Sequence, residues 1–263
     1  MTPTKHFVLT LVALLMTVAQ GAQAECTRLV ISADPAYPPL HWYDGHTLQG
    51  ASIAIAKRVL DDLKIPYEVR YIGPFPRVMA AAEHGAIDMV STLKKTPERE
   101  AFLVYPKTPA LSNPVAVFTS REKILDFKDR ADLVGLKGGI TRGNVFGADF
   151  DDYLKQNLNI EEANTPENSF NKLSMGRLDY FITGYYAGMA YLLRRGDEER
   201  FIAKHPFVVD TPNYLALTRK GHCAGKIDAI EARLAVLKSS GVLDELVRQS
   251  FAKWKANPVL VSD

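Results

Sequence analysis

Apolar positions follow two different periods along this chain. Three short apolar runs, at residues 28–33, 67–72 and 87–91, have the length and composition of β-strands. Between the first two runs, apolar residues recur at the three- and four-residue spacing of a helix, namely Ile53, Ala56, Val59, Leu60 and Leu63. The order repeats later, with strands expected at 132–140 and 178–183 around a helix at 145–158. Such alternation of strands and helices predicts an α/β fold.

A short internal repeat indicates that the fold has two similar halves. The segments EHGAIDMV (83–90) and SMGRLDYF (174–181) share the order helix end, glycine, aliphatic residue, aspartate and strand. Gly85 and Gly176 are therefore expected to end their helices in the left-handed conformation. The β-like segments 105–120 and 204–220 predict strands that leave the first half and return to it. Two helices, with apolar stripes at 227–237 and 243–251 and Gly241 between them, are expected to follow.

Composition and net charge exclude one large class of partner. The 263 residues are 47% hydrophobic and 24% charged, with a formal net charge of +2. This is the composition of a soluble globular protein, without the basic block that a nucleic-acid partner requires. The cationic pairs at 94–95 and 194–195 are interpreted as solvated faces. The histidines lack paired ligand spacing and no cofactor motif is present, so neither a metal nor a cofactor is predicted.

The first 24 residues have the organisation of a cleavable signal peptide. Lys5 provides a short positive region, residues 7–19 form an apolar run too short to span a bilayer comfortably, and small residues precede Glu25. Glu25 directly before Cys26 argues against lipid attachment. We therefore expect an exported, soluble protein. In an oxidising compartment Cys26 and Cys223 can form a disulfide, and two unpaired buried thiols are the alternative.

The segment KKTPEREAF (94–102) contains an electrostatic mismatch. Thr96 and Pro97 predict a helix start, with threonine as the cap and proline at the first helical position. Arg99 then falls in the first turn, where the helix dipole disfavours a cation by roughly 0.3–1 kcal/mol. No residue one turn away supplies a carboxylate to neutralise it. Lys94 and Lys95 add two further cations to the same place.

Five motifs give the chain a resemblance to a known family. They are ISADPAYPPLHW, GAIDMVSTLKKTPEREAFLVYP, DLVGLKGGITRGNVFG, LSMGRLDYFI and LKSSGVLDELVRQSFAKW. Over nearly all of residues 26–255 the chain resembles the family 3 extracellular solute-binding proteins, the periplasmic receptors of polar amino-acid ABC transporters. The resemblance implies a periplasmic monomer with a two-lobed type II periplasmic-binding-protein fold (a Venus flytrap), in which two hinge strands allow closure over ligand. The expected division is a signal peptide at 1–24, a first lobe at 25–118 plus 209–263, and a second lobe at 119–208.

The same resemblance implies a ligand site between the lobes. In family members with amino-acid ligands, the arginine that matches Arg99 clamps the ligand's α-carboxylate, a role that suits a guanidinium. A bound anion would also remove the penalty at the helix start; an ion pair with a distant carboxylate or the other lobe is the alternative. The Gly-rich turn with Arg142, Gly143 and Asn144 matches the place where the family sets backbone donors against the ligand, although a plain strand-to-helix turn would use the same residues.

Aromatic and polar residues complete the expected site. The aromatic side chains could belong to the core as readily as to the cleft, while Ser91 and Thr92 follow a strand that faces the Arg99 helix. The candidates are Tyr37, Trp42, Phe75, Arg77, Ser91, Thr92 and Tyr185.

One departure from the family pattern bears on the ligand. Where amino-acid receptors typically carry an aspartate for the ligand's ammonium, this chain has Gly184. We therefore expect a small carboxylate-bearing solute, either an organic anion or a modified amino acid or peptide, captured for import through an ABC permease. Two alternatives stay open. One is an enzyme resembling periplasmic cyclohexadienyl dehydratases, with Asp34 and Asp44 as the nearest acids; the other is a sensor that reports ligand to a membrane receptor.

Overall fold

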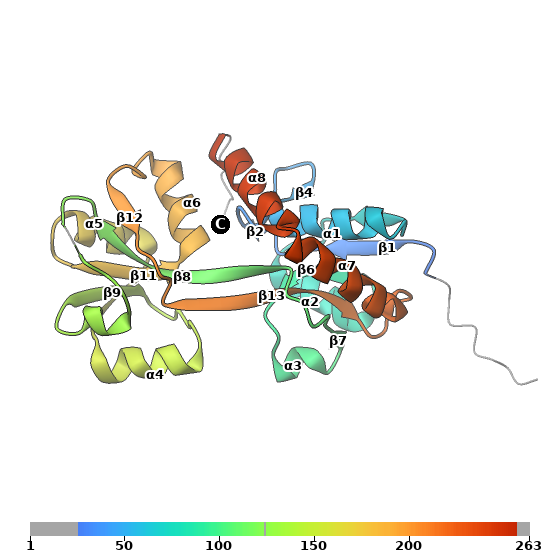
Figure 1. The fold of residues 1–263 in the computed structure, drawn as a ribbon, viewed down its shortest axis with the longest axis horizontal. Coiled ribbons are helices and arrows are strands. Elements are labelled where there is room, and N and C mark those ends of the chain that lie inside the picture. Colours follow the sequence, from blue (N-terminus) through green and yellow to red (C-terminus); the bar gives the residue numbers. More distant parts are fainter. Residues whose placement is uncertain (1–25, 124, 257–263) are drawn as a thin grey trace, which may run out of the picture.

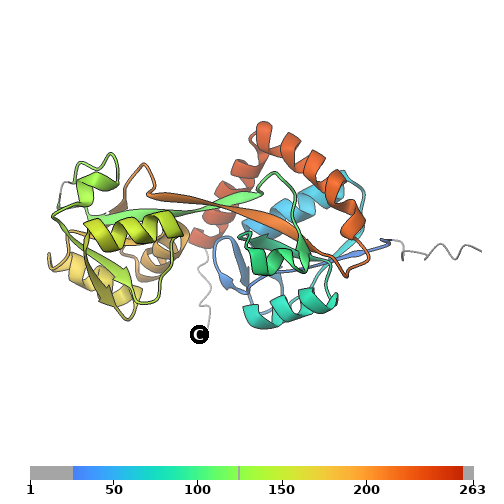
Figure 2. The same ribbon diagram turned by 90° about the horizontal axis from the view of Figure 1, so that it is seen from below.

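Two long strands connect two α/β lobes. The computed structural model describes residues 26–123 and 125–256, and the expected signal peptide at 1–24 lies outside them. Strands β8 (Leu111–Ser120) and β13 (Val209–Thr218) run antiparallel, in register from Leu111 opposite Asn213 to Val115 opposite Val209. Figures 1 and 2 show both strands passing side by side between the lobes. They correspond to the strands that the sequence predicts within 105–120 and 204–220.

The first lobe is a sheet with helices on both faces. Its strands lie in the order β13-β6-β1-β5, and β5 and β6 both run parallel to β1. One face packs against α1, α7 and α8, and the other face packs against α2. The elements are β1 (Leu29–Ser32), β5 (Tyr67–Val69), β6 (Met89–Leu93), β7 (Leu103–Val104), α1 (Ala51–Asp62), α2 (Phe75–His84), α3 (Pro97–Glu100), α7 (Ile227–Ser239) and α8 (Val242–Ala256).

A small three-stranded sheet lies between β1 and α1 in the chain. It consists of β2 (Ala36–Tyr37), β3 (His41–Tyr43) and β4 (Leu48–Gln49). The hydroxyl of Ser250 in α8 donates a 2.8 Å hydrogen bond to the carbonyl oxygen of Pro39, which fixes this sheet against α8. The small sheet therefore stands at the edge of the first lobe, beside α8 (Figure 1).

The second lobe repeats the layered arrangement around β8. Its strand order is β10-β9-β11-β8, and β12 pairs with β8. Because successive strand residues point to opposite faces, Val115 and Val117 pack with α4, whereas Ala116 and Phe118 pack with α5 and α6. The elements are β9 (Lys137–Thr141), β10 (Asn159–Ala163), β11 (Tyr180–Gly184), β12 (Phe201–Ala203), α4 (Ala148–Asn157), α5 (Pro166–Ser174) and α6 (Tyr185–Arg195), with short 3-10 turns η1 (Arg130–Leu133) and η2 (Ala224–Lys226).

The expected elements are present, and the structure adds α6, β12 and the small sheet β2–β4, which the sequence analysis does not predict. Two further differences have local causes. Gly85 and Gly176 have positive φ angles of 77° and 66°, which confirms them as helix terminators. The strand expected over 132–140 begins only at Lys137, because Asp129 and Asp132 form a reciprocal cap that holds the preceding residues in η1. Strand β10 has no apolar alternation in its sequence NIEEA, because it is the mostly exposed edge strand of the sheet.

The predicted boundary between residues 118 and 119 falls inside β8. The four residues before it, 115–118, already pack with the helices of the second lobe. The residue limits of the two lobes therefore stay a prediction, whereas the two separate sets of core residues are a feature of the structure. No helix in the two described ranges is both long and apolar enough to cross a bilayer.

A disulfide joins Cys26 to Cys223, across 197 residues of sequence. It ties the segment that precedes β1 to the segment that follows β13, and it confirms the bonded alternative of the sequence analysis. Cys223 is fully buried in the core shared with α1 and α7, and the partly buried Cys26 packs against that core, with the two Cα atoms 4.8 Å apart. The bond therefore fastens both ends of the first lobe's sheet to one core.

Replacing both cysteines by serine should lower the free energy of unfolding by about 2–5 kcal/mol, because the bond closes a long loop in the unfolded chain. Urea unfolding of the oxidised protein and of the Cys26→Ser/Cys223→Ser variant measures the difference. Equal unfolding midpoints with equal slopes would contradict the expectation.

Candidate ligand-binding site

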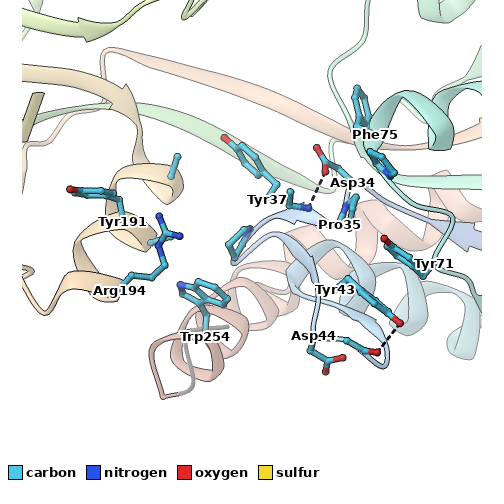
Figure 3. A pocket seen from close by; sticks show the side chains of 16 residues that line it. Asp34, Pro35, Tyr37, Tyr43, Asp44, Tyr71, Phe75, Tyr191, Arg194 and Trp254 are labelled. Atoms are coloured by element: carbon cyan, nitrogen blue, oxygen red, sulfur yellow. Dashed lines mark hydrogen bonds between the residues drawn. The ribbon is translucent and has the colours of Figure 1, made fainter. Parts of the chain in front are cut away.

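A cavity of about 830 Å³ lies between the two lobes. On the first lobe its walls are the β2–β3 region and the segment leading into α2, and on the second lobe its wall is α6 (Figure 3). The side chains that give it chemical character are Tyr37, Tyr43, Tyr71 and Phe75 on the first lobe and Tyr191 and Arg194 on α6. The cavity is thus largely aromatic, with one guanidinium at its second-lobe side.

Tyr37 reaches from the first lobe to the second. Its hydroxyl accepts a 3.0 Å hydrogen bond from the side-chain amide of Asn113 in β8, and burial raises the pKa of Tyr37. A Cβ atom built on Gly184, at the end of β11, would lie only 3.3 Å from that hydroxyl oxygen. A side chain at residue 184 would therefore require the Tyr37 hydroxyl to shift by a few tenths of an ångström.

Two further aromatic walls face the same space. The rings of Tyr43 and Tyr71 stack at a centroid distance of 3.9 Å and an interplanar angle of 13°. The Tyr43 hydroxyl donates a 2.8 Å hydrogen bond to the carbonyl oxygen of Gly45, which fixes its ring. Phe75 begins α2, whose first turn is preceded by Pro74. These rings offer flat, apolar surfaces suited to stacking on a planar group.

Helix α6 is held in place by a close contact with β8. A Cβ atom on Gly188 would lie 2.5 Å and 2.6 Å from two ring atoms of Phe118, so only glycine allows the helix to approach this strand. The helix then places Arg194 at the cavity (Figure 3), while the ring of Tyr191 stacks on Phe170 at a centroid distance of 5.1 Å, within the second lobe. Arg195 instead pairs with Glu167 at 2.6 Å and with Asp197 at 3.1 Å, away from the cavity walls.

Arg99 lies next to the cavity rather than in its wall. The side-chain hydroxyl of Thr96 caps α3, as the sequence predicts. The half-buried guanidinium donates a 3.0 Å hydrogen bond to the carbonyl oxygen of Lys94 and lies 5.6 Å from the ring centroid of Phe75. In the described part of the chain, no carboxylate lies within 4.0 Å of it, and Lys95 rather than Arg99 pairs with Glu100, at 2.9 Å.

A second cation increases the positive charge beside Arg99. Burial, and then repulsion from Arg99, lower the pKa of Lys94, while the carboxylate of Asp151 in α4 acts in the opposite direction. Asp151 itself accepts hydrogen bonds from the backbone N–H groups of Phe146 and Gly147, at 3.0 Å and 3.1 Å. Figure 1 places α3 and α4 on the same side of the connecting strands, so the start of α4 faces these cations across the gap.

Ser91 and Thr92 are buried beneath this region. The Ser91 hydroxyl lies 2.8 Å from that of Ser52, and the Thr92 hydroxyl donates a 2.7 Å hydrogen bond to the carbonyl oxygen of Ser91. Both hydroxyls therefore have partners within the first lobe. Their contact with a ligand stays a prediction.

The turn that holds Arg142, Gly143 and Asn144 lies on the second lobe, outside the cavity wall. Gly143 has a positive φ of 79°, as the tight turn requires. The exposed Arg142 side chain lies 3.4 Å from Glu162, and its backbone N–H donates to the carbonyl oxygen of Ala163. The structure does not bring this turn into contact with Arg99, so its role as a ligand contact stays a prediction that requires closure of the lobes.

Three other candidates take structural positions. Trp42 is 1% exposed and packs edge-on against Trp254 at 5.3 Å, in a buried cluster that also contains Ala190 of α6. Arg77 is exposed, with its guanidinium folded over Gly73. Tyr185 packs among the rings of Tyr186, Phe207 and Phe251. None of these three side chains lines the cavity.

Tyr191, Arg194 and Tyr71 line the cavity but are absent from the sequence-based site. The pair at 194–195 looks like a solvated face in the sequence, and only the packing of α6 separates the two arginines. Tyr71 carries no motif, and its exposed ring is explained by the stack with Tyr43.

The two acidic side chains of the cavity wall accept hydrogen bonds from backbone N–H groups of the turns to which they belong. Asp34 accepts a 3.0 Å hydrogen bond from the backbone N–H of Ala36. Asp44 accepts hydrogen bonds from the backbone N–H groups of Thr47 and His46, at 2.7 Å and 2.9 Å, and these bonds hold its pKa below the usual range. The carboxyl group of Asp44, held as an anion by these bonds, is poorly suited to donate a proton.

Comparison with known proteins agrees with this architecture. The sequence model of the bacterial extracellular solute-binding proteins, family 3, matches residues 29–253. A comparison with curated protein sequences gave no match. The two-lobed fold expected from the sequence is confirmed by solved structures of similar fold that cover 85% and 88% of this chain.

Three of these structures illustrate the likeness. Substrate-binding domain 2 of GlnP from Lactococcus lactis, in an open conformation, is 17% identical, with 85% of this chain and 95% of that chain covered and a TM-score of 0.69. The L-cystine solute receptor of Neisseria gonorrhoeae, unliganded and open, is 16% identical, with 88% and 95% covered and a TM-score of 0.71. The amino acid ABC transporter substrate-binding protein AbpA from Streptococcus pneumoniae, bound to L-arginine, is 21% identical, with 86% and 95% covered and a TM-score of 0.56.

Gly188→Ala should lower the free energy of unfolding by about 1–3 kcal/mol, because the added methyl group would overlap the Phe118 ring and push α6 from β8. Gly225→Ala is the matched control, since nothing lies within 4 Å of a Cβ atom there. Urea unfolding measures both. A Gly188→Ala protein at least as stable as the control would show that α6 does not depend on this contact.

Proposed function

This chain belongs to the bacterial extracellular solute-binding proteins, family 3, and on that basis we propose that it is a non-catalytic receptor for a small carboxylate-bearing solute. The solute would bind between the lobes, outside the inner membrane, and be passed to an ABC permease. Family membership supports the binding of a solute; the anionic ligand, the permease and the periplasmic location are the finer parts of the proposal.

One observation carries the choice of an anion. The Arg99 guanidinium is half-buried beside the cavity, next to Lys94, without a carboxylate partner in the described residues. Two neighbouring cations repel each other, and partial burial weakens the screening by water. A ligand carboxylate that accepts hydrogen bonds from the Arg99 guanidinium would supply the missing charge in a bidentate geometry.

Closure of the lobes follows from the position of the cationic site. Arg99 belongs to the first lobe, whereas the turn at 142–144 and the start of α4 belong to the second. A ligand held by both lobes binds more tightly to a closed arrangement than to the open one, and it therefore shifts the population toward closure. The two connecting strands allow such a change of angle without unfolding either core.

Recognition is favoured over catalysis by the state of the acids. The two acidic side chains of the cavity wall, Asp34 and Asp44, accept hydrogen bonds from their own turns. A lyase or hydrolase acting on a carboxylate would need a proton donor or acceptor free to reach the substrate. We therefore propose binding, and product formation from a bound carboxylate would replace this proposal.

Arg99→Ala should weaken binding of the cognate carboxylate about 100-fold, because a bidentate, charge-assisted interaction is lost. Calorimetry against a library of amino acids, oxo acids and dicarboxylates measures the affinities. Lys95→Ala is the matched control, since it removes a cation of the same segment that already pairs with Glu100.

The control should bind like the wild type, and both variants should unfold at the wild-type temperature. Undiminished affinity in Arg99→Ala would rule out the clamp. Equal loss in both variants would mean that only the general positive potential matters, and not the specific contact with Arg99.

A further inference from the structure

Arg194 has a position that neighbouring arginines do not share. It lines the cavity from α6, on the opposite side from Tyr71 and Phe75 (Figure 3). Among the described residues no carboxylate lies within 4.0 Å of its guanidinium, whereas the adjacent Arg195 pairs with both Glu167 and Asp197. An arginine on the wall of a cavity, without an internal partner, is a candidate contact for a ligand anion.

The size of the cavity leaves room for more than a clamped carboxylate. Its volume of about 830 Å³ lies in the range that drug-sized ligands fill. Its first-lobe wall is aromatic, with Tyr37, Phe75 and the stacked pair of Tyr43 and Tyr71. A planar, apolar body would gain most from these surfaces.

Phe75 connects the cavity to the cationic site. Its ring lines the cavity and also lies 5.6 Å from the Arg99 guanidinium. Phe75 thus belongs both to the cavity wall and to the surroundings of Arg99. From Phe75 the cavity extends past Tyr37 toward Arg194 on α6 (Figure 3).

We propose that Arg194 forms a second anion subsite, and that the ligand is an elongated molecule with an anionic group at each end of a planar apolar body. The inference rests on the proposed function, because Arg99 receives the first anion. It adds the class of ligand, a dianion larger than a single amino acid, and it assigns a binding role to α6.

Two other roles for Arg194 would change stability or ligand affinity in a different way from an anion subsite. A cation in the last turn of α6 complements the helix dipole, and this would affect stability without regard to the ligand. Alternatively, Arg194 could pair with Asp34 across the cavity when the lobes close. Such a pair would strengthen the binding of every ligand, whether or not it carries a second anion.

The test compares aromatic acids that differ by one carboxylate. Terephthalate and biphenyl dicarboxylate are titrated into the wild-type protein beside benzoate and biphenyl monocarboxylate, with calorimetric detection. The same titrations use Arg194→Gln, Arg195→Gln as the matched control, and Asp34→Asn. The two dicarboxylates differ in length, so the one that binds more tightly indicates the length of ligand that fits.

We expect at least one dicarboxylate to bind the wild type about tenfold or more tightly than its monocarboxylate, since a charge-assisted hydrogen bond is gained. Arg194→Gln should abolish that advantage and leave the affinity for monocarboxylates unchanged. Arg195→Gln should retain the advantage. Asp34→Asn should also retain it.

Several outcomes would overturn the inference. They are the absence of any dicarboxylate advantage in the wild type, equal behaviour of Arg194→Gln and Arg195→Gln, and parallel losses for all ligands in Arg194→Gln and Asp34→Asn. The proposed function is judged separately by the Arg99→Ala comparison in the wider library. A monocarboxylate that needs Arg99 but not Arg194 would uphold the function and reject the second subsite.

Discussion

The antiparallel pairing of β8 with β13 decides what each lobe can contribute to a ligand. Both strands run from one sheet into the other, so the lobes share backbone hydrogen bonds but keep separate cores. Helix α6 is the main additional contact, because Ala190 packs with Trp42 and Trp254. A change in the angle between the lobes would therefore bend two strands and slide one helix across an aromatic patch. Neither core would have to be repacked.

Charge is distributed unevenly around this junction. The first lobe places Arg99 and Lys94 together at the end of β6, and α6 adds Arg194 at the far side of an aromatic cavity. The acids of the cavity wall, Asp34 and Asp44, accept hydrogen bonds from backbone N–H groups of their own turns. Among the described residues, the acids of the wall thus have internal partners, whereas Arg99 and Arg194 have no carboxylate within 4.0 Å.

The fold was more accessible from the sequence than the site. Buried strands such as β1 and β6 are continuous apolar runs, and Gly85 and Gly176 mark helix ends, so local patterns predict them. Strand β10 escapes prediction because its stability comes from pairing with β9 rather than from apolar side chains. The first-lobe wall at Tyr37 and Phe75 could be expected from motifs. The position of Arg194 in the wall could not be predicted. Only the orientation of α6 against β8 places Arg194 at the cavity and Arg195 beside Glu167 and Asp197.

The disulfide has a consequence for the covalent topology of the chain. Cys26 and Cys223 close a ring that contains the whole second lobe and most of the first. A protease that cuts once in any loop between these cysteines opens the ring but releases no fragment. The nicked protein stays one molecule, with its lobes still joined through β8 and β13, and separates into two polypeptides only when a reductant and a denaturant act together.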